Sequence, residues 1–460
     1  MNLGSRRAFA LVVTFVACSA GVFGAAGAAH AATAQPNTVL STVLPFSNVA
    51  DTIVDTKTGY IFVSGDSTYV EVLSLSGRVL GQITNQQGAS GMALSADGGT
   101  LYVADTGGDS ISVINASTLA QVTSYSTPNL SPAHVALAGG ELWFTTASTL
   151  DVQKVDLATG TASPTTASTD YYGAALEASP DAPNTLVTGT YGLSSSTVYV
   201  YSVDAGALTL ATGNTGQLNS SMECDNLEGM VITPDGQSLV LSCGYPHYGL
   251  EVSLAGLDNE NTYNTGPYPN SAAVSSDDKV LIGVESGVNN GPLPVAEFDL
   301  GDSTAIADYG VNTAQDDSSD SVPFVAWGAN DSVFYAVVDG YGASPTLETI
   351  VLNSTMTLNA PALAHPGTSY AVTGSVTDLA GAEVTVSRVA GGTTTNLGPF
   401  TTDASGAFRF SDAVAKAGTT ATYTASVVGA STLTATASVP IIPVAYPVTA
   451  PRRGVAVLRH

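Results

Sequence analysis

Basic residues are scarce in this sequence. Of its 460 residues, 12 are Lys or Arg and 38 are Asp or Glu, which gives a formal net charge of -26. A chain this acidic repels a phosphate backbone, so we do not expect a nucleic-acid partner. Charged residues make up only 11% of the chain, which also contains 47 glycines. This composition argues against a helical protein with a charge-rich surface.

Several catalytic and cofactor motifs are also missing. The sequence has no CxxCH motif for haem, no HExxH motif for zinc, and no glycine-rich phosphate loop between a strand and a helix. After residue 31, no stretch approaches the roughly 18 apolar residues that a membrane-spanning helix needs. We therefore expect no transmembrane segment.

The one long apolar run lies at the N-terminus. Residues 1–31 combine Arg6 and Arg7, an apolar stretch and an Ala29-His30-Ala31 cleavage pattern, which together predict a signal peptide. We then expect the mature protein to be secreted or extracellular, and association with the cell surface stays open. The letters SRRAF resemble a twin-arginine export motif, and ordinary Sec export stays open. Residues 15–18 resemble a lipobox, which leaves lipidation at Cys18 open.

Cysteine is nearly absent, with three in the whole chain. If Cys18 leaves with the signal peptide, Cys224 and Cys243 remain. Two cysteines in an exported chain predict one disulfide. We expect their Cα atoms to lie closer than about 7 Å.

The acidic residues are unevenly distributed. Residues 37–353 contain 34 Asp and Glu against 4 Lys and Arg, whereas residues 354–460 contain 4 against 6. This shift predicts a domain boundary near residue 353.

A strand–turn–strand unit recurs through the acidic part. Its clearest copy is Leu94–Leu119, LSADGGTLYVADTGGDSISVINASTL, in which an Asp-Gly turn separates alternating strands. Seven such units, spaced roughly 40 to 50 residues apart with no helical periodicity, predict a seven-bladed β-propeller over residues 37–353. The last unit ends at Leu352 after its third strand. We expect the strand Asn37–Leu44 to supply the missing outer strand and close the ring.

The segment LYVADTGGDSISVINASTL resembles the repeat of the YVTN family of bacterial propellers. Ala104 and Asp105 stand where that repeat has Thr-Asn. The resemblance covers about Asn48–Leu352. It implies the propeller fold and says little about function, because such propellers mostly serve as scaffolds for binding.

The remainder of the chain differs in character. Residues 354–443 form short alternating strands rich in Thr, Val and Tyr, which predict a small β-sandwich. Its segments TTDASGAFRF and TATYTASVVGAS resemble bacterial Ig-like domains. The fold class expected overall is all-β, a seven-bladed propeller plus a C-terminal Ig-like sandwich. Residues 444–460 predict a disordered tail.

Candidate site residues come from aligning the innermost strands of the seven units. The aligned positions that open at the mouth of the central channel mostly hold small residues. The polar or aromatic exceptions that we single out are Asp51, His134, Tyr172, Glu228 and Asn270. We predict that these side chains form a binding site. Carboxylates beside carbonyl oxygens suit a hard cation, so Asp51, Glu228 and Asp225 are candidate ligands for calcium. No cofactor is required by the sequence.

An enzymatic alternative rests on two further resemblances. DNLEGMVITPDG (Asp225–Gly236) resembles a blade of phytase-like, calcium-dependent propeller hydrolases, and SPAHVALAGGELWFT (Ser131–Thr145) resembles a blade of streptogramin lyases. They imply His134 and Glu228 as acid–base residues of a metal-dependent hydrolase or lyase.

The main expectation is a binding or scaffold protein, not an enzyme. It would be monomeric and would recognise a surface glycan, a peptide or another protein through an acidic channel mouth. In the propeller, Cys224 precedes the innermost strand of the fifth unit and Cys243 ends its second strand, which places both at the mouth.

Overall fold

The computed structural model describes residues 37–65, 67–169, 172–193, 196–211, 224–266, 268–285, 294–311, 321–329, 331–340 and 343–444. The predicted signal peptide with Cys18, and residues 445–460 of the predicted tail, lie outside this part of the chain. In the described part, no helix is long and apolar enough to cross a membrane.

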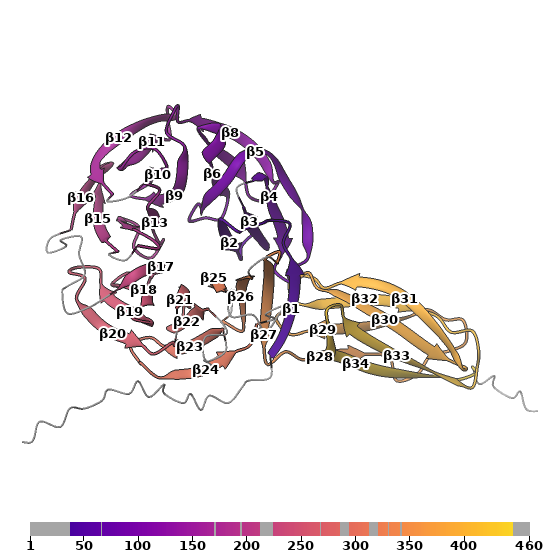
Figure 1. Ribbon diagram of the computed structural model, residues 1–460. Helices are drawn as coiled ribbons and strands as arrows, with labels where there is room; N and C mark the ends of the chain where they lie inside the picture. Colours follow the sequence, from indigo (N-terminus) through magenta and orange to yellow (C-terminus); the bar gives the residue numbers. More distant parts are fainter. Residues whose placement is uncertain are drawn as a thin grey trace, which may run out of the picture.

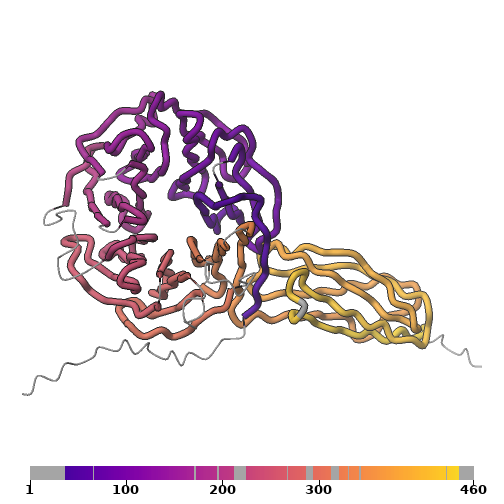
Figure 2. The backbone as a smooth tube through the Cα atoms, viewed as in Figure 1, coloured from indigo at the N-terminus to yellow at the C-terminus, as the bar shows by residue number. Residues whose placement is uncertain are grey.

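The chain runs once around a ring of sheets and then enters a separate pair of sheets (Figures 1 and 2). Four ring sheets each consist of four consecutive antiparallel strands. The first contains β9 (Pro132–Ala138), β10 (Glu141–Thr146), β11 (Asp151–Asp156) and β12 (Thr161–Ser168), and the second contains β13 (Ala175–Glu177), β14 (Thr185–Gly189), β15 (Val198–Asp204) and β16 (Ala207–Leu210). The third contains β17 (Asp225–Ile232), β18 (Ser238–Tyr245), β19 (Tyr248–Ser253) and β20 (Asn259–Tyr263). The fourth contains β21 (Pro269–Val274), β22 (Lys279–Val284), β23 (Val295–Asp299) and β24 (Ala305–Tyr309).

A fifth ring sheet has seven strands. Its elements are β2 (Asp51–Asp55), β3 (Tyr60–Ser64), β4 (Ser67–Ser74), β5 (Val79–Leu94), β6 (Thr100–Asp105), the short helix η1 (Thr106–Gly108), β7 (Ser110–Asn115) and β8 (Ala120–Ser126). The long strand β5 pairs with the strand before it through its first half and with the strand after it through its second half. The first half of β5 pairs with β4, from Val79 to Thr84. Its second half pairs with β6 through Met92 and Leu94.

The last ring sheet joins the two ends of the ring. Its strands are β25 (Ser321–Trp327), β26 (Val333–Asp339), β27 (Thr346–Leu352) and β1 (Asn37–Val43). β1 pairs antiparallel with β27 along its whole length, from Asn37 opposite Leu352 to Val43 opposite Thr346. The first described strand is therefore the outer strand of the last ring sheet.

The second strand of a ring sheet is buried on both of its faces. In β6, Leu101, Tyr102 and Val103 are each at most 9% exposed. Such a strand packs between two neighbouring sheets, so its sequence is a continuous apolar run instead of an alternating one. This burial explains the repeated letters of the LYVA type.

The C-terminal part consists of two sheets on a common core. One sheet contains β28 (Met356–Asn359), β29 (Tyr370–Val376) and β32 (Ala407–Asp412); the other contains β30 (Glu383–Ala390), β31 (Thr393–Thr401), β33 (Thr419–Val427) and β34 (Ala430–Ile441). Val372 and Phe410 of the first sheet share a hydrophobic cluster with Val386 and Tyr423 of the second.

The same cluster continues into the ring. Leu40 and Leu44, beside β27, belong to it together with Val427 and Ala430. The side chain of Leu40 lies 3.4 Å from the position that a Cβ atom on Gly429 would occupy. β1 therefore lies between the ring and the C-terminal sheets, as Figure 1 shows.

Candidate functional site

The innermost strands of the ring surround a central channel with a cavity at each end. One cavity, of about 520 Å³, opens near the starts of these strands and extends along the channel to the ends of β21 and β25; we call it the mouth cavity. Its lining includes Asp51, His134, Glu177, Tyr191, Glu228 and Trp327. The cavity at the other end, of about 620 Å³, is lined by residues of the turns that follow these strands, such as Lys57 and Gly98. Glu177 and Met92 border both cavities.

The structure brings some of the predicted site residues together and separates others. Asp51, His134 and Glu228 all line the mouth cavity, although they come from three different sheets. Tyr172 and Asn270 are not among its lining residues. Tyr172 is 52% exposed and precedes β13. The side-chain oxygen of Asn270 is buried with no hydrogen-bond partner among the described residues.

Glu177 is a site residue that the sequence alignment missed because it lies two residues beyond the aligned positions. It pairs with Val187, as Ile53 pairs with Phe62 at the equivalent place in another sheet. By the same register, Ala174 and Ala175 are the equivalents of Ala50 and Asp51. The alignment, which used Tyr172 and Gly173, therefore placed this sheet two residues too early.

The carboxylate of Asp51 bridges two neighbouring inner strands. Its Oδ1 accepts a hydrogen bond from the Thr52 N–H at 2.7 Å, and its Oδ2 accepts one from the Met92 N–H at 2.6 Å. An inner strand has an unpaired edge toward the channel, so these bonds satisfy backbone groups that the sheet leaves free. Burial raises the pKa of Asp51 to about 7, and the two hydrogen bonds oppose this shift.

Glu177 makes the same kind of contact between two other sheets. Its Oε1 accepts a hydrogen bond from the N–H of Ile232, in the next inner strand, at 3.2 Å. Burial raises the pKa of Glu177 to about 8, and the nearby charge of Asp51 adds to the increase. Near neutral pH each of these two carboxyl groups is therefore partly protonated.

Tyr191 lies close to the carboxylates of the mouth cavity. It is located in the loop between β14 and β15. Burial raises its pKa well above the ordinary value, and the charges of Glu177, Asp51 and Glu228 raise it further. Its hydroxyl therefore stays protonated and remains a hydrogen-bond donor.

His134 and Glu228 are polar residues of the cavity whose side chains have no hydrogen-bond partner among the described residues; we call them the unspent groups. Within the described part of the chain, neither side chain makes a hydrogen bond or an ion pair. Burial lowers the pKa of His134 to about 4, so its imidazole is neutral at physiological pH. The pKa of Glu228 is raised by burial and by the charge of Glu285.

The predicted metal ligands are not assembled. Among the residues that the structure describes, no three His, Cys, Asp or Glu side chains are grouped so that they could hold a metal ion. Asp225 starts β17 opposite Tyr245 and does not line the mouth cavity. Asp51 already uses both oxygens for backbone N–H groups. The set Asp51, Glu228 and Asp225 therefore does not form a calcium site in this geometry.

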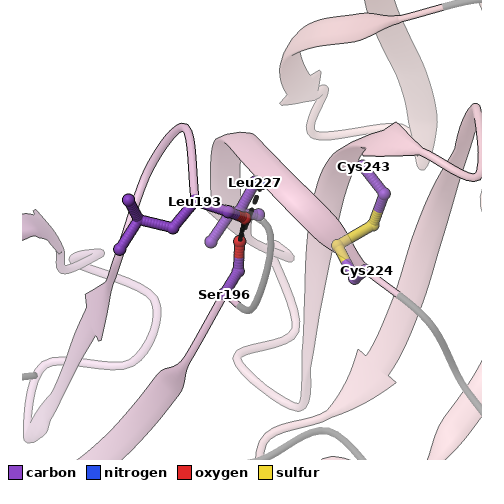
Figure 3. Close-up of a disulfide and its surroundings, with 5 residues drawn as sticks. All are labelled: Leu193, Ser196, Cys224, Leu227 and Cys243. Carbon is purple, nitrogen blue, oxygen red and sulfur yellow. Dashed lines mark hydrogen bonds between the residues drawn. A yellow bond between two sulfur atoms is a disulfide. The ribbon is translucent and has the colours of Figure 1, made fainter.

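The predicted disulfide is confirmed. Cys224 and Cys243 are bonded, and their Cα atoms lie 5.0 Å apart. Figure 3 shows this bond beside a second tie at the same end of the sheet: the Leu227 N–H donates to the Oγ of Ser196 at 3.0 Å, and that hydroxyl donates to the Leu193 carbonyl at 3.0 Å. Both links fix the start of β17, the strand that carries Glu228.

Exposed aromatic rings lie on the same side of the ring as the mouth cavity. Tyr245 is 49% exposed and Tyr268 is 38% exposed. His247 lies between them, with its ring centroid 6.0 Å from that of Tyr245 and 4.7 Å from that of Tyr268. Tyr245 pairs with Asp225 at the start of β17, which places these rings beside the mouth cavity. We call Tyr245, His247 and Tyr268 the aromatic rim.

Similar solved structures define the class of fold. A structure of hydrazine synthase from Kuenenia stuttgartiensis covers 66% of this chain and 96% of its own, at 14% identity and a TM-score of 0.51. The β-propeller domain of Cps50 (Swd1) from Myceliophteria thermophila covers 69% and 100%, at 9% identity and a TM-score of 0.50. A structure of the mitotic checkpoint complex matches over 75% and 99%, at 12% identity and a TM-score of 0.51.

The chain is thus all-β, and its ring is a β-propeller. At these identities the similarity shows the fold alone. No family model matches the sequence, and no curated protein matches it significantly. Function must therefore be argued from the site.

Proposed function

We propose that this protein is an exported β-propeller that binds a surface glycan, a peptide or another protein through its channel mouth. The observation that carries this proposal is the mouth cavity. It combines unspent polar groups, His134 and Glu228, with aromatic and apolar walls. Small, partly apolar cavities with a few well-placed polar groups are typical binding sites. The aromatic rim beside it offers exposed ring surface for stacking on a sugar or a peptide.

We propose seven blades for the ring. The long strand β5 serves as the outer strand of one blade and the inner strand of the next, which divides the seven-stranded sheet into two blades. β1 completes the last blade. The domains then correspond to a propeller at residues 37–353, of the YVTN type, and an Ig-like sandwich at residues 354–443 that spaces or docks it.

The cell compartment follows from the N-terminal sequence. Residues 1–31 support export, and one disulfide supports an oxidising compartment. We propose a secreted monomer that associates with the cell surface through its ligand.

A metal-dependent hydrolase or lyase is the second candidate. It is favoured by one observation, that Asp51, His134 and Glu228 line one cavity. Binding is the better-supported function because, among the described residues, no three His, Cys, Asp or Glu side chains are grouped as a metal site and no carboxylate partner orients His134. A calcium titration of the purified protein, with and without EDTA, tests the enzyme. A large change in melting temperature would favour it, and no change would count against it.

A pull-down tests the binding function. The full chain is incubated with isolated cell-surface polysaccharide and with a surface protein fraction, beside a variant carrying Tyr245→Ala and Tyr268→Ala. Because both side chains are exposed, the variant should fold and should retain less than about a tenth of the ligand. The matched control is Tyr172→Ala, an exposed tyrosine that does not line the cavity. Equal retention by all three proteins would contradict a binding role for the mouth.

A further inference from the structure

The mouth cavity contains three carboxyl groups that no Lys or Arg side chain in its described lining balances. Its described lining residues include the carboxylates of Asp51, Glu177 and Glu228 and contain neither Lys nor Arg. Lys57 lines the cavity at the opposite end of the channel instead. His134, the one basic side chain in the lining, is neutral. The electrostatic field inside the mouth cavity therefore favours a cation.

We propose that the mouth cavity binds an organic ammonium group, either on a small alkylammonium ion or on the lysine side chain of a peptide. The inference rests on the binding function proposed above and gives the chemistry of its ligand. Three features of the cavity support it: its unspent groups, its apolar walls and its size.

The unspent groups are positioned for a ligand from outside the chain. Asp51 and Glu177 hold backbone N–H groups, whereas Glu228 and His134 have no partner in the described part of the protein. Both side chains line the cavity and are partly exposed, so a ligand that enters the cavity can reach their polar atoms. Glu228 supplies a charge for the ammonium, and the neutral imidazole of His134 supplies a hydrogen-bond acceptor for an N–H.

The walls favour an organic cation over a metal ion. Calcium needs six to eight oxygen ligands, and this cavity does not group its carboxylates in that way. Tyr191, Phe324 and Trp327 line it together with Met92 and Met230. Aromatic side chains attract alkylammonium groups through their electron-rich faces, while methionine packs against the alkyl part. A volume of about 520 Å³ is large enough for a side chain of several carbons.

Ligand binding should also release protons. An ammonium in the cavity stabilises the charged forms of the carboxylates, so their pKa values fall when it binds. The ionisable groups that face the cavity are Asp51 from β2, His134 from β9, Glu177 from β13, Tyr191 from the loop after β14 and Glu228 from β17. The described lining residues from β5, β21 and β25 do not ionise. Affinity should therefore increase about tenfold between pH 6 and pH 8.5.

Calorimetric titration of the full mature protein with choline tests the proposal. The comparison ligand is the uncharged analogue of choline, in which carbon replaces the quaternary nitrogen. Choline should bind at least about tenfold more tightly than this analogue. N-acetyl-lysine methylamide, titrated in parallel, shows whether a lysine side chain is the better source of the ammonium group. If neither choline nor the lysine derivative binds, or if the uncharged analogue binds equally well, the proposal is wrong.

Two variants locate the site. Glu228→Gln keeps the shape of the side chain and removes its charge, so it should weaken choline binding about tenfold. Asp204→Asn makes the same change at an exposed position outside the cavity and should leave the affinity unchanged. Equal affinity in the wild type and Glu228→Gln would overturn the assignment to this cavity.

The surface pull-down separates this inference from the proposed function. A protein that retains surface material but ignores every ammonium probe is a binding protein with a different ligand, and the inference alone fails. A protein that binds choline but retains no surface material refutes the proposed surface ligand and supports the ammonium site.

Discussion

Asp51 and Glu177 perform the same task at two places in the ring. Each carboxylate accepts a backbone N–H from the neighbouring inner strand, Met92 in one case and Ile232 in the other. Each is partly buried beside the channel, and this burial raises its pKa toward neutrality. The channel wall is therefore held together partly by groups that titrate near physiological pH.

Glu177→Gln should change how stability depends on pH. The pKa of Glu177 is about 8 in the folded protein, whereas the ordinary value for a glutamate side chain is 4.5. Because the folded pKa is raised, the stability that this group contributes is complete below about pH 4.5 and is lost as the pH rises through 8. The variant does not titrate here. Between pH 5 and pH 9, the free energy of unfolding of the wild type, measured with urea, should therefore fall by on the order of 2 kcal/mol relative to that of the variant.

Tryptophan fluorescence is a suitable signal for this experiment, because Trp143 and Trp327 are the two tryptophans of the chain and both lie in the ring. Asp204→Asn is the control and should follow the wild type at every pH. A difference between wild type and Glu177→Gln that does not vary with pH would contradict the buried, titrating carboxylate.

At the scale of the elements, two links beyond the sheet pairing anchor the start of β17. The Cys224–Cys243 bond joins it to β18, and Ser196 joins it to the preceding sheet. We expect these links to hold Glu228 in place, since a side chain is positioned only as well as its strand.

Replacing both cysteines, Cys224→Ala and Cys243→Ala, should lower the free energy of unfolding by about 3 kcal/mol. The disulfide closes a loop with a sequence separation of 19, and opening it restores chain entropy to the unfolded state. The measurement is urea unfolding of the double variant and of the oxidised wild type, with the wild type under reducing conditions as the control. An unchanged unfolding midpoint in the double variant would show that the bond does not stabilise the ring.

Removing residues 37–43 should open the ring. β27 would lose seven paired residues and expose an unpaired sheet edge, which favours association with other chains. Size-exclusion chromatography should then show oligomers or aggregates. A synthetic peptide NTVLSTV should restore the monomer, whereas the same peptide with Leu40→Asp should not, because Leu40 is only 6% exposed. A truncated chain that stays monomeric without peptide would contradict closure by β1.

At the scale of the whole molecule, the ring and the C-terminal sheets share one hydrophobic cluster. β1 contributes Leu40 and Leu44 to it, and the C-terminal sheets contribute Val427 and Ala430. A polar tie lies nearby, since the hydroxyls of Thr38 and Ser354 are 2.6 Å apart. The same strand therefore closes the ring and contacts the second part of the protein.

A chain that ends at Asn353 should have a less stable ring. Loss of the C-terminal sheets exposes Leu40, and we expect this exposure to lower the free energy of unfolding of the ring by about 2 kcal/mol. Urea unfolding followed by tryptophan fluorescence measures the ring alone, because both tryptophans lie within it. Identical midpoints for the truncated and full chains would show that the two parts are energetically independent.

Much of the ring could be predicted from the sequence because its signals are local. Strand alternation, Asp-Gly turns and the LYVA-type runs depend on neighbouring residues and on burial between sheets, so they repeat along the chain. The disulfide could be predicted because few cysteines remain to pair. Asp51, His134 and Glu228 stood out as exceptions to a column of small residues.

The sequence by itself determined the all-β class, the repeated unit, the acidic character and the cysteine pair, because each depends on composition or short-range pattern. Only the tertiary structure decided which side chains meet at the channel. Glu177 enters the site from a position two residues further along its strand than the aligned mouth positions, and Tyr191 enters it from a loop. The carboxylate of Asp51 meets a backbone N–H group 41 residues away in the sequence. Such meetings depend on how separate sheets pack around a ring, and no local pattern encodes them.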